Sequence, residues 1–216
     1  MRRSKAKEKI IEVSEEMFSK VGYGALNVNN VAAEAGISIG TLYYHFPEGK
    51  VSILMEIRRR IASKYEEIFR EKLGKHFLED VRSFDDGLSV LIDVLIDVHY
   101  SERLVLAAME SEVLSNLTIY DELAGDLDIE ALIEEDTKPV VDVLEELLNR
   151  YPVDNLSLNG NGFLISKVID TLIHKFVYLE QIFGAKTVFK EMLTQIVYAL
   201  LKTDKRKSCE TKLHLF

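Results

Sequence analysis

Apolar residues recur every three or four positions along most of this 216-residue chain, which is the spacing of one face of an α-helix. The first run predicts an amphipathic helix over about residues 5–20, and its apolar positions are Ile10, Val13, Met17, Phe18 and Val21. No segment sustains the alternation of apolar and polar residues that is typical of strands. We therefore predict an all-α fold.

A second, shorter helix is predicted to begin at Asn27, whose side-chain oxygen can accept hydrogen bonds from the free backbone N–H groups. Val31 and Ala32 would face inward at helical spacing. Gly36 would end this helix, because a residue without a Cβ readily takes the positive φ found at helix C-termini. Ser38 then follows as a candidate cap for a third helix.

The third predicted helix would bury one face and expose polar and aromatic side chains on the other. Ile39, Leu42 and Phe46 are the inward positions, and Gly40, Thr41, Tyr43 and Tyr44 point elsewhere. Hydroxyl groups, a glycine that permits close approach, and the positive end of a helix dipole all suit phosphate. The pair of helices is typical of a helix-turn-helix that enters a major groove about 12 Å wide. A helical hairpin with half-buried tyrosines is the alternative.

A turn and a long fourth helix follow this pair. Residues 47–49, Pro-Glu-Gly, are a turn signal. Helical spacing then extends to about Leu73, with apolar residues at Ile53, Leu54, Ile57, Ile61, Tyr65, Ile68 and Phe69.

The segment from Ile10 to Leu54 resembles the N-terminal DNA-binding domain of the TetR (tetracycline-repressor) family of transcription regulators. The resemblance is carried by Phe18-x-x-x-Gly22-Tyr23, by Val31-Ala32-x-x-Ala35-Gly36-Ile37-Ser38, and by Gly40-Thr41-Leu42-Tyr43-Tyr44-His45-Phe46. It implies a dimeric regulator, most simply a repressor, that binds a palindromic operator and is released by a small molecule. The candidate DNA contacts are Asn27, Asn29, Ser38, Ile39, Gly40, Thr41, Tyr43, Tyr44, His45 and Lys50.

Two features depart from the family pattern. The second helix opens with Asn27-Val28-Asn29-Asn30 where the family usually has threonines, which puts the usual phosphate contact there in doubt. The loop Pro47-Glu48-Gly49-Lys50 is one residue longer than the commonest form, so Lys50 is assigned to the family's phosphate-binding lysine by resemblance alone.

Charge is divided unevenly along the chain. The net charge is −9, yet residues 1–60 contain ten Lys or Arg against seven Asp or Glu, so this segment is positive by three and the rest negative by twelve. A positive end favours DNA through phosphate neutralisation and counterion release, and an acidic remainder keeps the second domain off DNA. Arg2, Arg3, Lys5 and Lys7 could track a phosphate backbone or simply form a solvated terminus.

The rest of the chain reads as a larger helical domain. The predicted divisions are a DNA-binding domain at 1–50, a linking helix at 51–74, an effector-binding and dimerisation domain at 75–204, and a polar tail at 205–216. Gly74 to Asp86 mixes charge with turn formers and is predicted to be a hinge region. Asp121 to Asp128 reads as an acidic loop. Pro139 indicates either a kinked helix over residues 129–151 or two helices.

The last two predicted helices, about 163–183 and 185–202, carry more apolar residues than one core-facing stripe needs. A two-fold dimer built as a four-helix bundle would cover the excess, and burial within a large monomer core is the alternative. The predicted dimer contacts are Val168, Leu172, Phe176, Leu179, Phe189, Met192, Ile196 and Leu200.

A small hydrophobic effector is the expected ligand, because polar residues interrupt otherwise apolar helices as in most ligand pockets. Tyr100, Met109, His174 and Tyr178 are the candidate pocket residues, and dimer-seam hydrogen bonds or a solvated edge are the alternatives for these side chains.

Other classes of protein fit the sequence less well. The five histidines form no metal-ligand spacing, no glycine-rich phosphate loop is present, and Glu110 and Glu112 point to different faces of a helix, so we expect no enzyme, metal site or cofactor. One cysteine, Cys209, and the lack of a signal peptide or long apolar run predict a cytoplasmic protein without membrane contact. A helical dimer that coats DNA without sequence preference is the main rival function.

Overall fold

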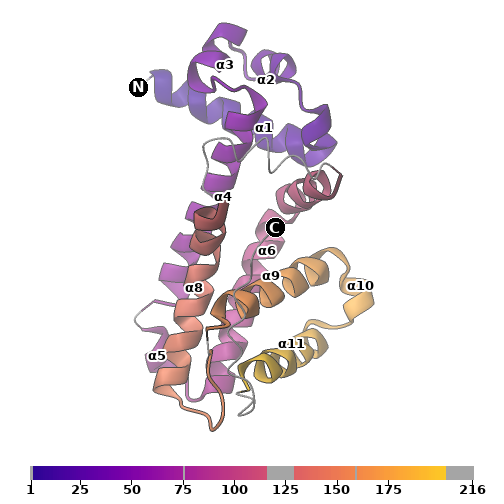
Figure 1. Ribbon diagram of the computed structural model, residues 1–216. Coiled ribbons are helices and arrows are strands. Elements are labelled where there is room, and N and C mark those ends of the chain that lie inside the picture. The colour runs from indigo at the N-terminus through magenta and orange to yellow at the C-terminus, as the bar shows by residue number, and fades with distance from the viewer. Residues whose placement is uncertain (1, 75, 116–128, 159, 203–216) are drawn as a thin grey trace.

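A computed structural model describes residues 2–74, 76–115, 129–158 and 160–202, and every regular element within these ranges is a helix. A small group of helices that contains the N-terminus sits at one end of a long helix, α4, and a larger group packs around the other end (Figure 1). The all-α prediction is therefore confirmed. Among the described helices none is long and apolar enough to cross a membrane.

The N-terminal group consists of α1 (Arg2–Ala25), α2 (Val28–Glu34), α3 (Ile39–His45) and the first half of α4 (Lys50–Lys72). Gly22 breaks α1 with a φ of 74°, close to the predicted end of the first helix. The four helices share one core, whose fully buried side chains include Ile10, Val31, Leu42, Ile53 and Ile57.

Helix α4 belongs to two cores. Ile53, Ile57 and Ile61 complete the N-terminal core, whereas Phe69 near the other end of the helix packs into the larger core. A rigid helix of this length transmits a displacement at either end to the other, because packed interiors resist compression.

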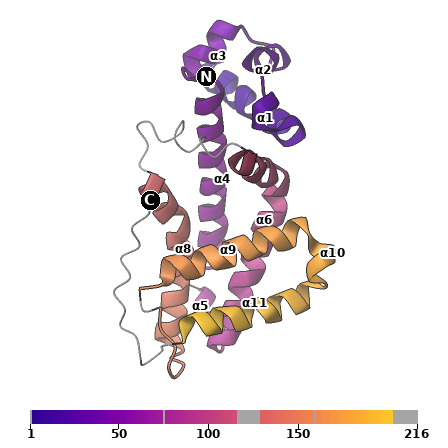
Figure 2. The same cartoon turned by 45° about the vertical axis from the view of Figure 1, so that its right-hand side comes forward.

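The larger group contains α5 (Phe77–Asp80), α6 (Phe84–Ser115), α8 (Ile129–Arg150), α9 (Gly162–Tyr178), α10 (Glu180–Phe183) and α11 (Lys186–Leu201). Helices α9 and α11 pack against each other, joined through α10, and lie across the long helices (Figure 2). The core between them includes Leu88, Leu91, Leu144, Ile169 and Leu193.

Two sequence interpretations change here. The predicted hinge over residues 74–86 contains α5, and Phe77, Val81 and Phe84 are all buried, so apolar packing fixes this segment in the core. Pro139 lies inside the single helix α8, so this segment forms one helix and not two. The predicted acidic loop at 121–128 and polar tail at 205–216 lie outside the described residues.

The two groups meet through the C-terminal half of α6. Its residues Val105, Ala108 and Met109 pack against Phe18 of α1 and Leu54 of α4. An ion pair between Lys64 and Glu102 joins α4 to the same stretch of α6. The N-terminal group of helices therefore touches α6 directly, in addition to the connection that α4 provides.

Candidate nucleic-acid interface and ligand cavity

The caps predicted for the helix-turn-helix are present. Asn27 Oδ1 accepts a hydrogen bond from the Asn29 backbone N–H at 2.8 Å and begins α2. Gly36 has a φ of 67°, and Ser38 Oγ accepts from the Thr41 backbone N–H at 3.1 Å to begin α3. Each cap satisfies a donor that a helix N-terminus otherwise leaves unpaired.

The outer surface of α3 presents aromatic and hydroxyl groups. Tyr43 and Tyr44 are 47% and 61% exposed, and Gly40 is exposed with open space around it. Thr41 is half-buried, and its hydroxyl shares a hydrogen bond with the Ser38 hydroxyl at 2.8 Å. These residues belong to α3, which lies at the end of the molecule furthest from α11 (Figure 1).

Helical spacing predicts that Ile39 packs inward with Leu42 and Phe46, and this is wrong for Ile39. Leu42 and Phe46 are buried, but Ile39 is 38% exposed. It is the first residue of α3, before the helix has turned its inward face to the core. Ile39 is therefore accessible, as its place among the candidate DNA contacts requires.

The remaining candidate contacts lie around these residues of α3. Asn27 and Asn29 are exposed at the start of α2, while the ring of half-buried His45 lies edge-on to Tyr44 at 5.1 Å between centroids. Lys50 opens α4 after Gly49, whose φ of 63° makes the turn possible. The structure thus brings all ten candidates to one end of the molecule.

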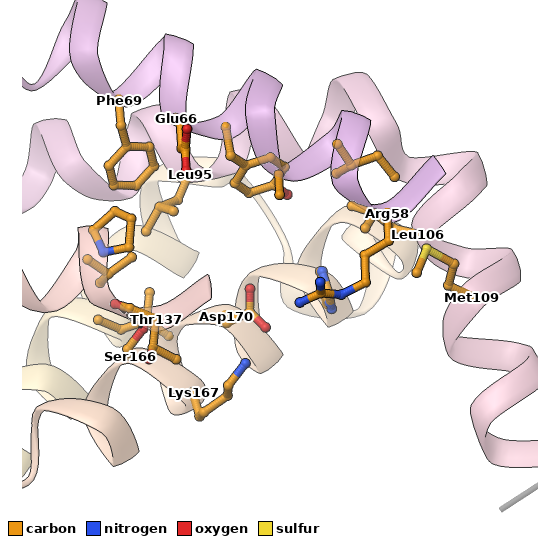
Figure 3. Close-up of a pocket in the computed structure, with 17 residues that line it drawn as sticks. Arg58, Glu66, Phe69, Leu95, Leu106, Met109, Thr137, Ser166, Lys167 and Asp170 are labelled. Atoms are coloured by element: carbon orange, nitrogen blue, oxygen red, sulfur yellow. Dashed lines mark hydrogen bonds between the residues drawn. The ribbon is translucent and has the colours of Figure 1, made fainter. Parts of the chain in front are cut away.

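A cavity of about 190 Å³ lies between α4, α6, α8 and α9. This volume is far larger than the roughly 10–15 Å³ that a single water molecule needs. One end contains Phe69 and Leu95 with Glu66 beside them, and the other contains Leu106 and Met109 (Figure 3). Four charged side chains line the cavity, namely Arg58, Glu66, Lys167 and Asp170, and Arg58 points from α4 toward Asp170 on α9 (Figure 3).

Two of the four predicted pocket residues line this cavity. Met109 and His174 are among its walls, whereas Tyr100 and Tyr178 are not. Tyr100 follows the buried His99 and therefore points to another side of α6, where its hydroxyl donates a hydrogen bond to Glu180 of α10. Tyr178, one turn after His174, stacks on that ring at 5.9 Å instead of facing the cavity.

Beside the cavity, a carboxylate and two imidazoles meet. His99 on α6 is 1% exposed, and its Nε2 lies 3.2 Å from Asp170 Oδ1 on α9. The His174 ring is 4.5 Å from the His99 ring between centroids. The potential ligand atoms of these three residues all lie within 4.8 Å of one another. The sequence offers one clue to this cluster, the four-residue spacing of Asp170 and His174, but nothing in it pairs them with His99.

The environment of this cluster sets the charge of two of its members. Burial lowers the pKa of His174 below the usual value, and the neighbouring His99 adds to this effect against the opposing attraction of Asp170. Burial alone would raise the pKa of Asp170, but the contact with His99 and the positive charge that the neighbouring His174, His99 and Lys167 can carry outweigh it and lower that pKa. At neutral pH, His174 is therefore neutral and Asp170 ionised.

Helices α9 and α11 lie side by side (Figure 2), and we call the apolar side chains that they expose the α9–α11 face. Its exposed members include Leu164 and Val188, at 50% and 58%. Of the predicted dimer contacts, Leu179 is exposed and five others are half-buried, namely Val168, Leu172, Met192, Ile196 and Leu200.

The last two predicted dimer contacts lie elsewhere. Phe176 and Phe189 are each 1% exposed, and their rings stack at 4.2 Å within the subunit's own core. They face the core because α9 and α11 pack on each other and on α6 through these positions. A side chain without exposed surface has no area to offer a partner, so Phe176 and Phe189 are removed from the predicted dimer contacts.

Comparison with known proteins agrees with this geometry. Residues 10–57 match the family described as bacterial regulatory proteins, tetR family. The chain is 32% identical over 69 residues to the HTH-type transcriptional regulator LmrA of Bacillus subtilis, covering 32% of this chain and 35% of LmrA. It is 25% identical over 154 residues to an uncharacterized HTH-type transcriptional regulator of Lactococcus lactis, covering 71% and 70% of the two chains. LmrA and a second Bacillus subtilis relative, the uncharacterized HTH-type transcriptional regulator YerO, are each matched over about a third of their own length.

The same relation extends to solved structures. A protein from Mesorhizobium loti described as a TetR-family transcriptional regulator superposes with a TM-score of 0.66 at 21% identity, covering 93% of this chain and 97% of the other. At this level of sequence identity, the similarity shows a shared fold. The relatives are named as transcription regulators and not as enzymes. Residues 10–57 therefore carry the helix-turn-helix of the tetR family of bacterial regulatory proteins, and the chain as a whole shares the fold of a TetR-family regulator.

Proposed function

We propose that this protein is a DNA-binding transcriptional regulator that acts as a dimer and is released from a palindromic operator by a small effector. The exposed surface of α3 carries this proposal. Tyr43, Tyr44 and Gly40 face solvent on a helix that is capped at its N-terminus and held from behind by buried Leu42. A helix supported in this way can enter a major groove without disturbing its own core.

The α9–α11 face supports the dimer. Leu164 and Val188 are apolar, and at least half of each side chain is exposed in the single chain. The alternative, in which one large monomer core covers these helices, would leave such side chains buried. A two-fold axis at this face would pair α9 and α11 with their copies in a four-helix bundle. Two copies of α3 would then have to reach successive major grooves, about 34–36 Å apart.

The position of the cavity supports a response to a ligand. Its walls include Ile61 and Ala62 of α4 and Leu106 and Met109 of α6. Ile61 also belongs to the N-terminal core, and Met109 packs against Phe18. An occupant that moves α4 or α6 would therefore displace the helix-turn-helix. A coupling free energy of about 1–3 kcal/mol is enough to change DNA occupancy tenfold or more.

The effector that we propose is small, mainly hydrophobic, and equipped with a polar group. Apolar side chains lie at both ends of the cavity, Glu66 lies beside Phe69 and Leu95, and Arg58, Lys167 and Asp170 lie between the two ends. A ligand whose polar group meets these side chains while its apolar part contacts Phe69 or Met109 would satisfy both.

Substitutions on α3 should separate phosphate contacts from base contacts. We expect Tyr43→Phe to weaken binding to all DNA sequences alike, because it removes only a hydroxyl aimed at phosphate. We expect Thr41→Ala and Tyr44→Ala also to relax base preference, by about 1–3 kcal/mol at the contacted position. Titration of operator and scrambled duplexes measures both effects, and equal affinity of wild type and the Tyr43→Phe variant would contradict the phosphate role.

Filling the cavity should abolish the binding of an effector. Ala62→Phe places a ring in the cavity, whereas Ser63→Phe on the adjacent exposed position of α4 is the matched control. We expect the Ala62→Phe variant to lose at least about tenfold in affinity for an effector, since the ring occupies its volume. Isothermal titration with a compound found by screening measures this, and an unchanged affinity would place the effector elsewhere.

The experiment that tests the function as a whole is selection of bound duplexes from random DNA, followed by a screen for compounds that release the selected duplex. Recovery of one short palindrome supports the regulator. Protection of all sequences with similar, salt-dependent affinity would instead favour the rival in which a helical dimer coats DNA.

A further inference from the structure

The cluster of His99, Asp170 and His174 has an arrangement that calls for a cation. His99 Nδ1 lies 2.7 Å from the backbone oxygen of Leu95, and a carbonyl oxygen can only accept a hydrogen bond. Nδ1 must therefore carry a hydrogen, which leaves the lone pair of an imidazole on Nε2. Nε2 lies 3.2 Å from Asp170 Oδ1, and a carboxylate has only lone pairs to offer. Two acceptors at this distance require either a proton or a metal ion between them.

We propose that His99, Asp170 and His174 form a binding site for a divalent first-row transition-metal ion, with Zn²⁺ as its representative. Two imidazoles and one carboxylate are the donors that such ions prefer, whereas Mg²⁺ and Ca²⁺ prefer oxygen ligands alone. Three protein ligands leave at least one coordination position for another molecule.

The distances fit this class of ion. Two ligands that each lie about 2.0–2.1 Å from a tetrahedral Zn²⁺ are separated by roughly 3.4 Å, close to the 3.2 Å between His99 Nε2 and Asp170 Oδ1. The third donor, on His174, lies within 4.8 Å of the others, so a small side-chain rotation brings it to the ion.

The surroundings hold the rings in place. The hydrogen bond from His99 Nδ1–H to Leu95 is the usual outer contact of a metal-bound histidine, which fixes its tautomer and orientation. The ring of Tyr65 lies edge-on to His99 at 5.5 Å between centroids, and that of Tyr178 stacks on His174. Two elements of the fold are thus joined at this point, because His99 belongs to α6 and the other two ligands to α9.

The site would open into the ligand cavity. Asp170 and His174 line the cavity, whereas His99 lies behind them in the core. The free coordination position of the ion therefore faces the space where an effector would lie, and an anionic or chelating group could bind there. This last consequence rests on the proposed ligand response, but metal binding itself does not.

Cobalt binding to the full chain tests the site without any DNA, so its outcome is independent of the regulatory function. The protein is freed of metal with a chelator and titrated with Co²⁺, whose visible absorption reports its ligands, and Zn²⁺ is then added in competition. We expect one Co²⁺ per chain, displacement by Zn²⁺ but not by equal Mg²⁺, and a change in the spectrum on adding azide, which would occupy the free position.

Variants locate the ion. We expect Asp170→Asn and His174→Gln to weaken Co²⁺ binding by at least about a hundredfold, since even an outer contact of a metal ligand is worth 10–100-fold. His76→Gln is the matched control, because His76 is an exposed histidine remote from the cluster, and it should bind as wild type. A Cys209→Ser/His214→Gln variant should also bind as wild type, which excludes the C-terminal residues.

The thermal unfolding of each variant is measured without metal, to establish that it is folded. Zn²⁺ should raise the midpoint of wild type and of the two controls but not of the Asp170→Asn and His174→Gln variants, because an ion stabilises only the state that binds it. Co²⁺ binding that is absent in wild type, or equally strong in the folded His174→Gln and Asp170→Asn variants, would overturn the proposal. In that case, a proton alone would occupy the space between His99 and Asp170.

Discussion

Gly40→Leu should abolish specific DNA binding while leaving the protein as stable as wild type or more so. The backbone around Gly40 leaves room for a side chain, since the atom nearest to the position that a Cβ would take is Ser38 Oγ, at 3.8 Å. Leucine also favours a helix over glycine by up to about 1 kcal/mol. The new side chain should therefore not lower the stability of the protein. It projects, however, from the surface that we propose to lie against DNA.

The size of the expected loss follows from geometry. A helix in the major groove lies within a few ångströms of base edges, and an isobutyl group there keeps the backbone away from every neighbouring contact. Because a dimer carries the substitution in both copies, we expect specific affinity to fall by at least about a thousandfold, toward the non-specific level. Fluorescence anisotropy with labelled operator measures the affinity, and thermal unfolding measures stability.

Two further variants make this result interpretable. Gly40→Ala adds a single methyl group and should give an intermediate loss, whereas Glu146→Leu introduces the same side chain on exposed α8 and should change nothing. Operator affinity of the Gly40→Leu variant within a few-fold of wild type would mean that this surface does not face DNA.

Short-range signals make the DNA-binding end predictable from the sequence. The caps at Asn27 and Ser38 and the left-handed turn at Gly36 depend on residues at most three positions apart, and the structure has all three. Burial of Ile39 is a wrong prediction because helical spacing alone does not say where the first turn of a helix leaves its core. That position depends on the approach of α3 to α1 and α2, which the spacing does not contain.

The cavity and the histidine cluster depend on which helices become neighbours. Tyr100 and His99 are adjacent in the sequence, yet one reaches α10 and the other the core against α9. The sequence predicts Phe176 at the dimer surface because α9 is apolar on most sides. An apolar residue on such a helix can pack either into the core of its own subunit or against a second subunit. Such assignments require the rotation of each helix about its axis, which tertiary packing sets and local sequence does not.

The cavity lies next to the N-terminal group of helices, so the proposed effect of an occupant has only a short distance to travel. Met109 lines the cavity and packs against the cluster formed by Phe18 of α1 and Leu54 of α4, so one side chain separates an occupant from the helix-turn-helix domain. The ion pairs of Lys7 with Glu56 and of Arg60 with Glu8, at 3.0 and 3.2 Å, join α1 to α4. A displacement of α4 or α6 would therefore carry α1 with it, and through α1 the helices α2 and α3.

Leu164→Glu combined with Val188→Glu should convert the protein to monomers and thereby remove most of its operator affinity. Both side chains are exposed in the single chain, at 50% and 58%, so the substitutions cost little in folding. In a two-fold dimer across the α9–α11 face, each would place uncompensated carboxylates in an apolar interface, four in all, which is strongly unfavourable. Sedimentation velocity at micromolar concentration measures the change in mass.

The loss of DNA affinity should follow from the loss of linkage between two recognition helices. In a dimer the second α3 binds at the high effective concentration that its partner imposes, and this contributes about 10²–10⁴-fold to affinity without any new contact. The monomer should therefore bind the operator at least about a hundredfold more weakly than the dimer does. It should bind a single half-site as well as it binds the full operator. Leu104→Glu, at a comparably exposed leucine of α6, should remain dimeric and bind as wild type. A double variant that sediments as a dimer would place the two-fold axis on another surface, whereas a monomer with full operator affinity would separate DNA recognition from assembly.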